Sequence, residues 1–221
     1  IKLIMPVESL IKKKVRMENV VTNLKLEYPD SKCSLRYESS FQLLTATILS
    51  AQCTDERVNK VTKGLFANYP TPQDFVMLPI ETIKKEIYST GFYNNKAKSI
   101  KAMAESVVNE YGGSLPDTLD EMVKLPGVGR KTANVVLGNI QGIPSIVVDT
   151  HVTRITNLLK FVKTKNAVKI ETELSKIINK NDWTLFAHLL IDHGRAVCIA
   201  NRPKCNKCVI SNLCPSKLGE T

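Results

Sequence analysis

The sequence predicts an all-α protein. Apolar residues recur at the three- and four-residue spacing of amphipathic helices through most of the chain. Alternating apolar and polar runs, which would predict half-buried strands, are almost absent, and Ile143–Ile146 is long enough only for an extended link. Residues that start or stop helices separate the periodic segments.

The first expected helix is basic and amphipathic. We expect the charges of Lys12, Lys13, Lys14 and Arg16 to be solvated on its polar side, while its other face packs. That apolar face comprises Leu10, Ile11, Val15, Val20, Val21 and Leu24.

Further apolar faces follow along the chain. They are Phe41, Leu44, Thr45 and Ile48; Val58, Val61, Leu65 and Phe66; Ile83 and Ile87; and Ile100, Met103, Ala104, Val107 and Val108. Pro70 and Pro72 predict a loop, and Gly112-Gly113 predicts a helix end.

A helical hairpin is expected next. Thr118–Glu121 resembles a capping box for a short helix. Gly127 and Gly129 then form a Gly-x-Gly turn that opens into a helix with Arg130 and Lys131 in its first turn. Such a turn leaves amide groups at the helix start free to point at an anion, and the helix dipole adds positive charge there. The spacing alone also fits a tight interhelix turn with a solvated lysine.

An apolar run, Val147-Val148, ends in Asp149 just before another helical pattern that contains Val152 and Ile155. A carboxylate at this position is a candidate catalytic group. It also suits a helix N-cap, for which aspartate is a preferred residue.

Four of the six cysteines form a dense group, Cys198-x6-Cys205-x2-Cys208-x5-Cys214. The spacing permits a four-thiolate zinc site, a cubane iron–sulfur cluster or disulfides. Basic residues are interleaved with the group: Arg195, Arg202, Lys204 and Lys207. Cys33 and Cys53 lie outside it, and we expect both to be small buried apolar residues.

The composition favours a polyanionic partner. Lys and Arg number 31 against 21 acidic residues, which gives a net charge of +10 and a pI near 9.3. Many RNA-binding proteins are equally basic. The 221 residues, 43% of them hydrophobic, suffice for a substantial core in a chain that folds alone. No apolar run approaches the roughly 18 residues of a membrane span, and Ile1–Pro6 lacks the long apolar core of a signal peptide. We therefore expect an intracellular protein.

Together these motifs resemble the helix-hairpin-helix DNA glycosylase superfamily, and within it the endonuclease III family. The resemblance covers nearly the whole chain apart from about the first dozen residues. The segments that carry it are Ser40–Leu44, Leu49–Asp55, Gly91–Ala97, the hairpin with Lys131, Asp149 eighteen residues later, and the cysteine group.

The resemblance implies two domains. Residues 34–143 would form a six-helix domain that contains the hairpin. Residues 1–33 and 144–221, from both chain ends, would form an iron–sulfur cluster domain. Lys131 and Asp149 would then lie on opposite walls of a cleft between them, a common place for active sites. A monomer is expected.

The resemblance also implies a base excision repair enzyme, a bifunctional glycosylase and abasic-site lyase that acts on oxidised or ring-saturated pyrimidines. Lys131 would attack the sugar and form a Schiff base, with Asp149 stabilising the positive charge. The amine must be neutral to attack, so partial burial and a neighbouring cation such as Arg130 are expected.

The remaining assignments concern DNA and cofactor. Gln52 would fill the gap left by a flipped nucleotide, with Phe92, in place of the commoner leucine, wedged beside it. Packing at loop tips is the alternative for both residues. His151 would contact a phosphate or the flipped nucleotide, unless it is a structural histidine. The resemblance makes the cysteines ligands of a [4Fe-4S] cluster.

Lys204 and Lys207, on the loop that this cluster would organise, would touch DNA phosphates. The implied partner is double-stranded DNA with damaged pyrimidines or abasic sites, in a bacterial cytoplasm and close to the nucleoid. His188 and His193 receive no role.

Three rivals remain. Adenine-removing and thymine mismatch glycosylases share the superfamily, but the lysine at position 131 disfavours both. The adenine enzyme also needs an extra recognition domain, for which the chain has no room after the cysteines. A noncatalytic helix-hairpin-helix DNA-binding module with a structural metal is the rival from another class, and Lys131 together with Asp149 argues against it.

Overall fold

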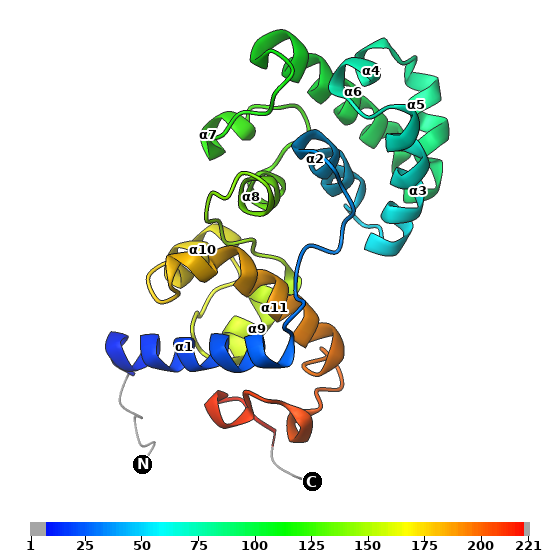
Figure 1. Cartoon of the computed structure of the whole chain (residues 1–221). Helices are drawn as coiled ribbons and strands as arrows, with labels where there is room; N and C mark the ends of the chain where they lie inside the picture. Colours follow the sequence, from blue (N-terminus) through cyan, green and yellow to red (C-terminus); the bar gives the residue numbers. More distant parts are fainter. Residues whose placement is uncertain (1–7, 219–221) are drawn as a thin grey trace. The chain divides into compact units, whose positions relative to one another are not determined.

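A computed structural model describes residues 8–218, which fall into two compact units. Unit 1 combines both chain ends, residues 1–32 and 146–221, and unit 2 is the continuous segment Cys33–Ser145. All regular elements in the described part of the chain are helices, which confirms the all-α prediction (Figure 1). Residues 1–7, on which the expectation about a signal peptide rested, lie outside it. Within the described range no helix is both long and apolar enough to cross a bilayer.

Unit 2 contains helices α2 to α8, of which α7 is a single turn. Their bounds are α2 Ser40–Leu49, α3 Asp55–Asn68, α4 Pro72–Met77, α5 Ile80–Ile87, the 3-10 turn η1 Tyr88–Thr90, α6 Tyr93–Tyr111, α7 Leu119–Met122 and α8 Arg130–Asn139.

Short polar side chains set where several of these helices begin. Ser39 and Thr54 cap α2 and α3. Each side chain accepts a hydrogen bond from the main-chain N–H of the residue three positions later. Thr71 and Asp74 form a reciprocal capping box at α4. The expected loop around Pro72 is therefore wrong in part. Pro72 is the first residue of α4, where its missing N–H costs nothing and its fixed φ suits the helix.

One core holds unit 2 together. Helix α2 packs against α3, α6 and α8, while α4 and α5 pack against α6 and α7 against α8. The apolar faces expected from the sequence supply much of this core, with Leu44, Leu65, Ile83, Ile87 and Ile100 fully buried. Helix α6 ends at Tyr111, as the two glycines that follow it predicted.

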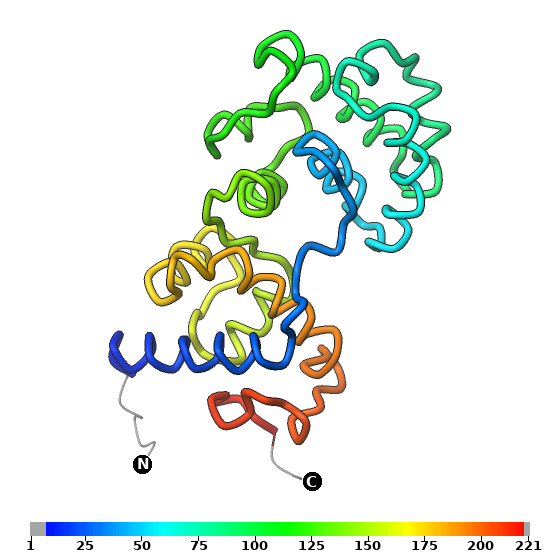
Figure 2. Tube along the Cα trace, viewed as in Figure 1, coloured from blue at the N-terminus to red at the C-terminus, as the bar shows by residue number. Residues whose placement is uncertain are grey.

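Unit 1 is built from the two ends of the chain, which Figure 2 shows side by side in blue and in orange to red. Helix α1 packs against α11 and the turn η4, and α9 against α11. The bounds are α1 Leu10–Glu27, α9 Thr150–Leu158, α10 Ala167–Leu174, η2 Lys180–Asp182, α11 Trp183–Ala196, η3 Cys205–Lys207 and η4 Ser211–Leu213.

The two halves of α1 differ. Val20, Val21 and Leu24 are buried as expected, together with Met17. The expected packing of Leu10, Ile11 and Val15 is wrong, since all three are more than half exposed. The apolar face thus extends beyond the part of the helix that neighbours cover, which periodicity alone does not reveal.

Candidate functional site

The helical hairpin of unit 2 consists of α7, a turn over residues 123–129, and α8. Thr118 caps α7 by accepting from the main-chain N–H of Glu121 at 3.3 Å. The second hydrogen bond of the expected capping box, from the main-chain N–H of Thr118 to the Glu121 carboxylate, is not formed. Instead the Glu121 carboxylate accepts from the Tyr111 hydroxyl at 3.0 Å and pairs with Lys124 at 2.5 Å. The short helix is thereby tied to the end of α6.

The two glycines of the turn have different roles. Gly127 has φ +75°, and a Cβ there would lie 2.6 Å from the Cβ of Ser99 on α6. Only glycine fits this close approach. Gly129 has an ordinary φ of −89° and caps α8 with its backbone, and a Cβ on it would meet open space. A steric need for glycine therefore exists at Gly127 and not at Gly129.

Arg130 and Lys131 are the first two residues of α8, and both are exposed. The partial burial expected for Lys131 is therefore not found. Its backbone nevertheless belongs to a first turn whose N–H groups have no carbonyl earlier in the helix to bind. The turn thus presents main-chain donors that lack intrahelical partners and two cationic side chains on one exposed helix start.

Asp149 of unit 1 caps α9. Its Oδ1 accepts from the main-chain N–H of Val152 at 2.8 Å, so the capping role considered for it is confirmed. The side chain is half-buried, and its second oxygen has no hydrogen-bond partner among the described residues. One carboxylate oxygen therefore holds the helix while the other is left available for a ligand.

His151 lies in the first turn of the same helix, half-buried. Its Nδ1 is 3.3 Å from Nη2 of Arg154, and a side chain at Gly194 on α11 would collide with the ring. Burial lowers the pKa of His151, Arg154 and Arg195 lower it further, and Asp149 opposes them. The imidazole is therefore neutral at pH 7, which suits a hydrogen bond better than a charge contact.

Gln52 and Phe92 of unit 2 are both exposed on short connections between helices. Their φ angles are +54° and +49°, a left-handed backbone conformation that residues other than glycine rarely adopt. Only Lys160 shares it among the described non-glycine residues. Phe92 is 63% exposed, so packing at the loop tip is a poor description of it. Holding such residues in a costly backbone conformation is typical of functional positions.

The four cysteines of the dense group lie around one cavity in unit 1, about 360 Å³ in volume. Each thiol is half-buried. Burial raises the pKa of Cys208 to about 11; a main-chain hydrogen bond at Ile210 opposes this effect, and the neighbouring thiols add to it. Within the described range, no three His, Cys, Asp or Glu side chains are arranged to hold a single metal ion. The cavity is far roomier than one ion requires.

Two residues that the sequence left without a role lie against this group. Nε2 of His193 is 3.4 Å from Sγ of Cys208, while its Nδ1 is 3.1 Å from the hydroxyl of Tyr28. Burial lowers the pKa of His193 to about 4, so the ring is neutral. Arg154 donates to the carbonyl of Cys198 at 2.5 Å. No local sequence motif predicts these contacts, because each joins residues far apart in the chain.

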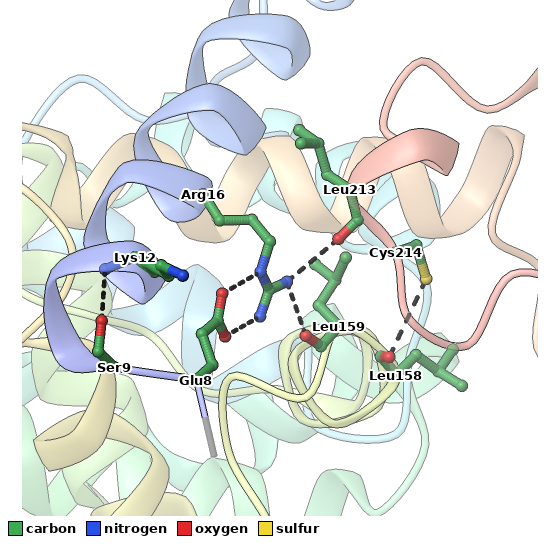
Figure 3. Close-up of polar contacts among 8 residues, drawn as sticks. All are labelled: Glu8, Ser9, Lys12, Arg16, Leu158, Leu159, Leu213 and Cys214. Carbon is green, nitrogen blue, oxygen red and sulfur yellow. Dashed lines mark hydrogen bonds and ion pairs between the residues drawn. The ribbon is translucent and has the colours of Figure 1, made fainter. Parts of the chain in front are cut away.

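Arg16 corrects the expectation of a solvated charge run. Its guanidinium pairs with both carboxylate oxygens of Glu8 at 2.7 and 2.8 Å and donates to the carbonyls of Leu159 and Leu213 at 2.9 and 3.1 Å (Figure 3). It also lies 4.1 Å above the ring of Phe161. Only 15% of the side chain is exposed. The charge is enclosed because main-chain carbonyls and a carboxylate converge on it from three segments.

The basic residues of the cysteine loop remain at the surface. Lys204 and Lys207 are both exposed, and Nζ of Lys204 donates to the carbonyl of Ala196 at 3.2 Å. Cys33 and Cys53 are half-buried against the core of unit 2, rather than fully buried as expected. Burial raises the pKa of Cys33, as it does for a thiol without a cation nearby.

The chain is similar to several known proteins. Residues 45–180 match the family model described as HhH-GPD superfamily base excision DNA repair protein. The chain is 47% identical over 205 residues to Endonuclease III of Synechocystis sp., covering 92% of this chain and 94% of the relative.

Two solved structures are also similar to it, a non-covalent Endonuclease III–DNA complex and a trapped Endonuclease III–DNA covalent intermediate. Each is 41% identical with a TM-score of 0.87, over 92% of this chain and 96% of the other.

Proposed function

Since the chain belongs to the HhH-GPD superfamily of base excision DNA repair proteins, we propose that it removes oxidised or ring-saturated pyrimidines from duplex DNA. It is a DNA glycosylase with lyase activity, and it nicks the abasic site that it generates. We further propose that it works in a bacterial cytoplasm on chromosomal DNA, and the bacterial source of the relative reported above supports this.

The observation that carries the proposal is the position of Lys131. It is the second residue of α8, directly after the hairpin turn, and its amine is exposed to a ligand. In our proposal this amine attacks C1′ of the damaged nucleotide and the base departs with the electrons of the glycosidic bond. The sugar ring then opens as the C1′–O4′ bond breaks and O4′ takes up a proton released by the amine, which leaves a Schiff base between Nζ and C1′. Loss of a C2′ proton then expels the 3′ phosphate and breaks the strand.

Asp149 is the proposed electrostatic partner. Positive charge develops on the sugar as the glycosidic bond breaks, and a carboxylate nearby stabilises it. The capping bond to Val152 uses only Oδ1, so the second oxygen can face the sugar or accept the proton of the attacking amine. Lys131 belongs to unit 2 and Asp149 to unit 1. We propose that units 2 and 1 correspond to the six-helix and cluster domains expected from the sequence.

We assign the phosphate grip to the hairpin. The N–H groups at the start of α8, which lack intrahelical partners, and the positive end of the helix dipole favour an anion there. Open space beside Gly129 lets a DNA backbone approach, and Arg130 adds charge at the same helix start. Such contacts fix position without reading sequence, so recognition of the lesion needs other residues.

Gln52 and Phe92 are the proposed readers of the opened duplex. A glycosylase must take the damaged base out of the stack, and inserted side chains replace it. Both residues are exposed and held in left-handed backbone conformations, which supports a role outside the core. We assign His151, neutral and adjacent to Asp149, to a hydrogen bond with the flipped nucleotide or its phosphate.

We further propose that the cysteine group binds a [4Fe-4S] cluster. Cys198, Cys205, Cys208 and Cys214 supply four thiolates around a 360 Å³ cavity, a donor set that iron–sulfur clusters use and a space that suits a polynuclear group. The bound cluster would order the loop that carries Lys204 and Lys207, which would contact DNA phosphates. Analysis of the purified protein should find about four irons and four sulfides per chain. A single zinc without sulfide would contradict this assignment.

A noncatalytic DNA-binding module is the rival that an experiment must exclude. Incubation with a duplex containing a ring-saturated thymine under borohydride should trap a protein–DNA adduct, and peptide mapping should place it on Lys131. Lys131→Gln should lose both the adduct and strand nicking. Because the phosphate grip uses main-chain groups, this variant should still bind the damaged duplex. Normal nicking by Lys131→Gln, or an adduct on another lysine, would overturn the proposal.

A further inference from the structure

Lys96 is a buried lysine that the proposed reaction does not use. It lies in the first turn of α6, and only 6% of the residue is exposed. No carboxylate pairs with it among the described residues. A buried ammonium is costly unless it is fully hydrogen-bonded, so its partners indicate why it is there.

Those partners are two main-chain carbonyls from separate segments. Nζ donates to the carbonyl of Leu49, the last residue of α2, and to the carbonyl of Thr90, the last residue of η1, at 2.8 Å each. Both carbonyls lie at helix ends, where carbonyl groups lack intrahelical partners and the dipole is negative. The ammonium thus links the C-terminal ends of α2 and η1, which are separate segments of the chain.

The segments that leave these two ends carry the proposed DNA-inserting residues. Gln52 is three residues after Leu49, and Phe92 is two residues after Thr90. We call residues 50–54 the Gln52 loop and residues 91–92 the Phe92 loop. Lys96 also donates its main-chain N–H to the carbonyl of Phe92 at 3.1 Å. One residue therefore binds the Phe92 loop at both ends and the Gln52 loop at its start.

The surroundings of the ammonium agree with this bridge. Burial lowers the pKa of Lys96, and Cys53 of the Gln52 loop opposes that effect. The Gln52 side chain itself is exposed, on a backbone with a φ of +54°. Its position therefore depends on the backbone that Lys96 helps to hold.

We propose that Lys96 is a positioning residue that ties the Gln52 loop to the Phe92 loop, so that both side chains enter the damaged duplex as one unit. The inference rests on the proposed insertion of Gln52 and Phe92 into DNA. It adds that insertion by either residue depends on the other. Lys96 itself touches no reacting atom.

Lys101, five residues further along α6, offers a matched control. Its Nζ donates to the carbonyls of Phe75, Val76 and Leu78 at the end of α4, so it satisfies a helix end in the same way. That end carries neither loop. Lys96→Met and Lys101→Met therefore remove the same kind of contact, and only the first releases the Gln52 and Phe92 loops.

The test is a double-mutant cycle on base removal. Single-turnover rates on a duplex with a ring-saturated thymine are measured for Gln52→Ala, Phe92→Ala and the pair. If the loops act as one unit, the pair should be little slower than the slower single variant. In the Lys96→Met background the two effects should multiply, whereas in the Lys101→Met background they should remain coupled.

Two further readouts separate positioning from stability. Lys96→Met should slow base removal about ten- to a hundredfold, the scale expected for a misplacement of about 1 Å. Fluorescence of 2-aminopurine opposite the lesion should report weaker unstacking in this variant. Lys96→Arg, which keeps the donors, should restore much of both. Lys101→Met should change neither, even when matched in melting temperature.

The possible outcomes distinguish failure of the loop-coupling inference from failure of the proposed lyase mechanism. Independent effects of Gln52→Ala and Phe92→Ala in the otherwise native protein would overturn the inference, whether or not Lys96→Met folds. Coupling that survives in Lys96→Met would overturn it too. If neither alanine variant slows base removal while Lys131 is still trapped, the insertion role fails and the inference with it, but the lyase mechanism stands.

Discussion

Arg16 donates a hydrogen bond to the carbonyl of Leu213, the residue immediately before Cys214, across 197 positions of sequence. The same nitrogen donates to Leu159, at the end of α9. Through one guanidinium, α1 is therefore fastened to the segment that carries a proposed cluster ligand. Substitution at Arg16 should disturb the cysteine loop without touching a thiol.

We expect Arg16→Met to lower the free energy of unfolding by about 1–3 kcal/mol, because it removes the partners of a carboxylate and of two largely buried carbonyls. Bound iron should also be lost faster to a chelator. Lys14→Met, at an exposed position of the same helix, is the control and should change neither value. Urea unfolding and iron release measure the two effects, and iron retention equal to that of the control would contradict the link to Cys214.

Gly127→Ala and Gly129→Ala should separate fold from binding. The first places a Cβ 2.6 Å from that of Ser99 at φ +75°, and should cost about 1–3 kcal/mol of stability. The second meets open space and an ordinary φ, so the protein should keep nearly all of its stability and lose affinity for duplex DNA of any sequence. Thermal unfolding and DNA titration report the two. Equal destabilisation by both substitutions would refute the distinction.

Asp149→Asn and Asp149→Ala should separate capping from chemistry. Asparagine caps helices as well as aspartate, so the first variant should keep its stability. It should nevertheless remove bases more slowly by a factor on the order of 10², the scale for losing one electrostatic stabiliser. Alanine should add a stability loss of about 1 kcal/mol. Single-turnover kinetics with unfolding curves measure both, and a fully active Asp149→Asn would restrict this residue to its capping role.

The salt dependence of DNA binding should distinguish Lys207 from His151. Lys207→Ala should lower the slope of log affinity against log salt by about one, since one phosphate contact and its counterion release are lost. Burial and neighbouring arginines hold the pKa of His151 below its ordinary value, so at pH 7.5 it is neutral. His151→Gln should therefore leave the slope unchanged. A fall in the slope on substitution of His151 would show that it binds as a cation.

Local features of the fold could be predicted from the sequence because their causes are local. Ser39, Thr54 and Thr118 cap the helices that follow them, and Gly112 ends the helix before it, through bonds within a few residues. The four cysteines surround one cavity because close spacing keeps three of them together in any loop. Pro72 shows the limit, since a proline fits a loop and the first turn of a helix equally well.

What could not be predicted depends on distant pairs. Arg16 looks like one more cation on a polar helix face until the carbonyls of Leu159 and Leu213 are brought to it. Lys96 looks like an ordinary first-turn lysine, and nothing near it indicates that Leu49 lies within reach. His193 likewise meets Cys208 only through the fold. Sequence periodicity identifies which residues are apolar, but it does not identify which polar groups are enclosed.

The assembly of unit 1 from both chain ends sets an order of events during translation. Helix α1 leaves the ribosome long before α11 and η4 exist, and at about 5–20 residues per second the 197 positions from Arg16 to Leu213 take on the order of ten to forty seconds. The continuous segment Cys33–Ser145 is complete within that interval and contains a hydrophobic core of its own. During this interval the apolar face of α1 is not yet covered by α11 and η4. We therefore expect chaperones and proteases to act on the nascent chain mainly at this helix.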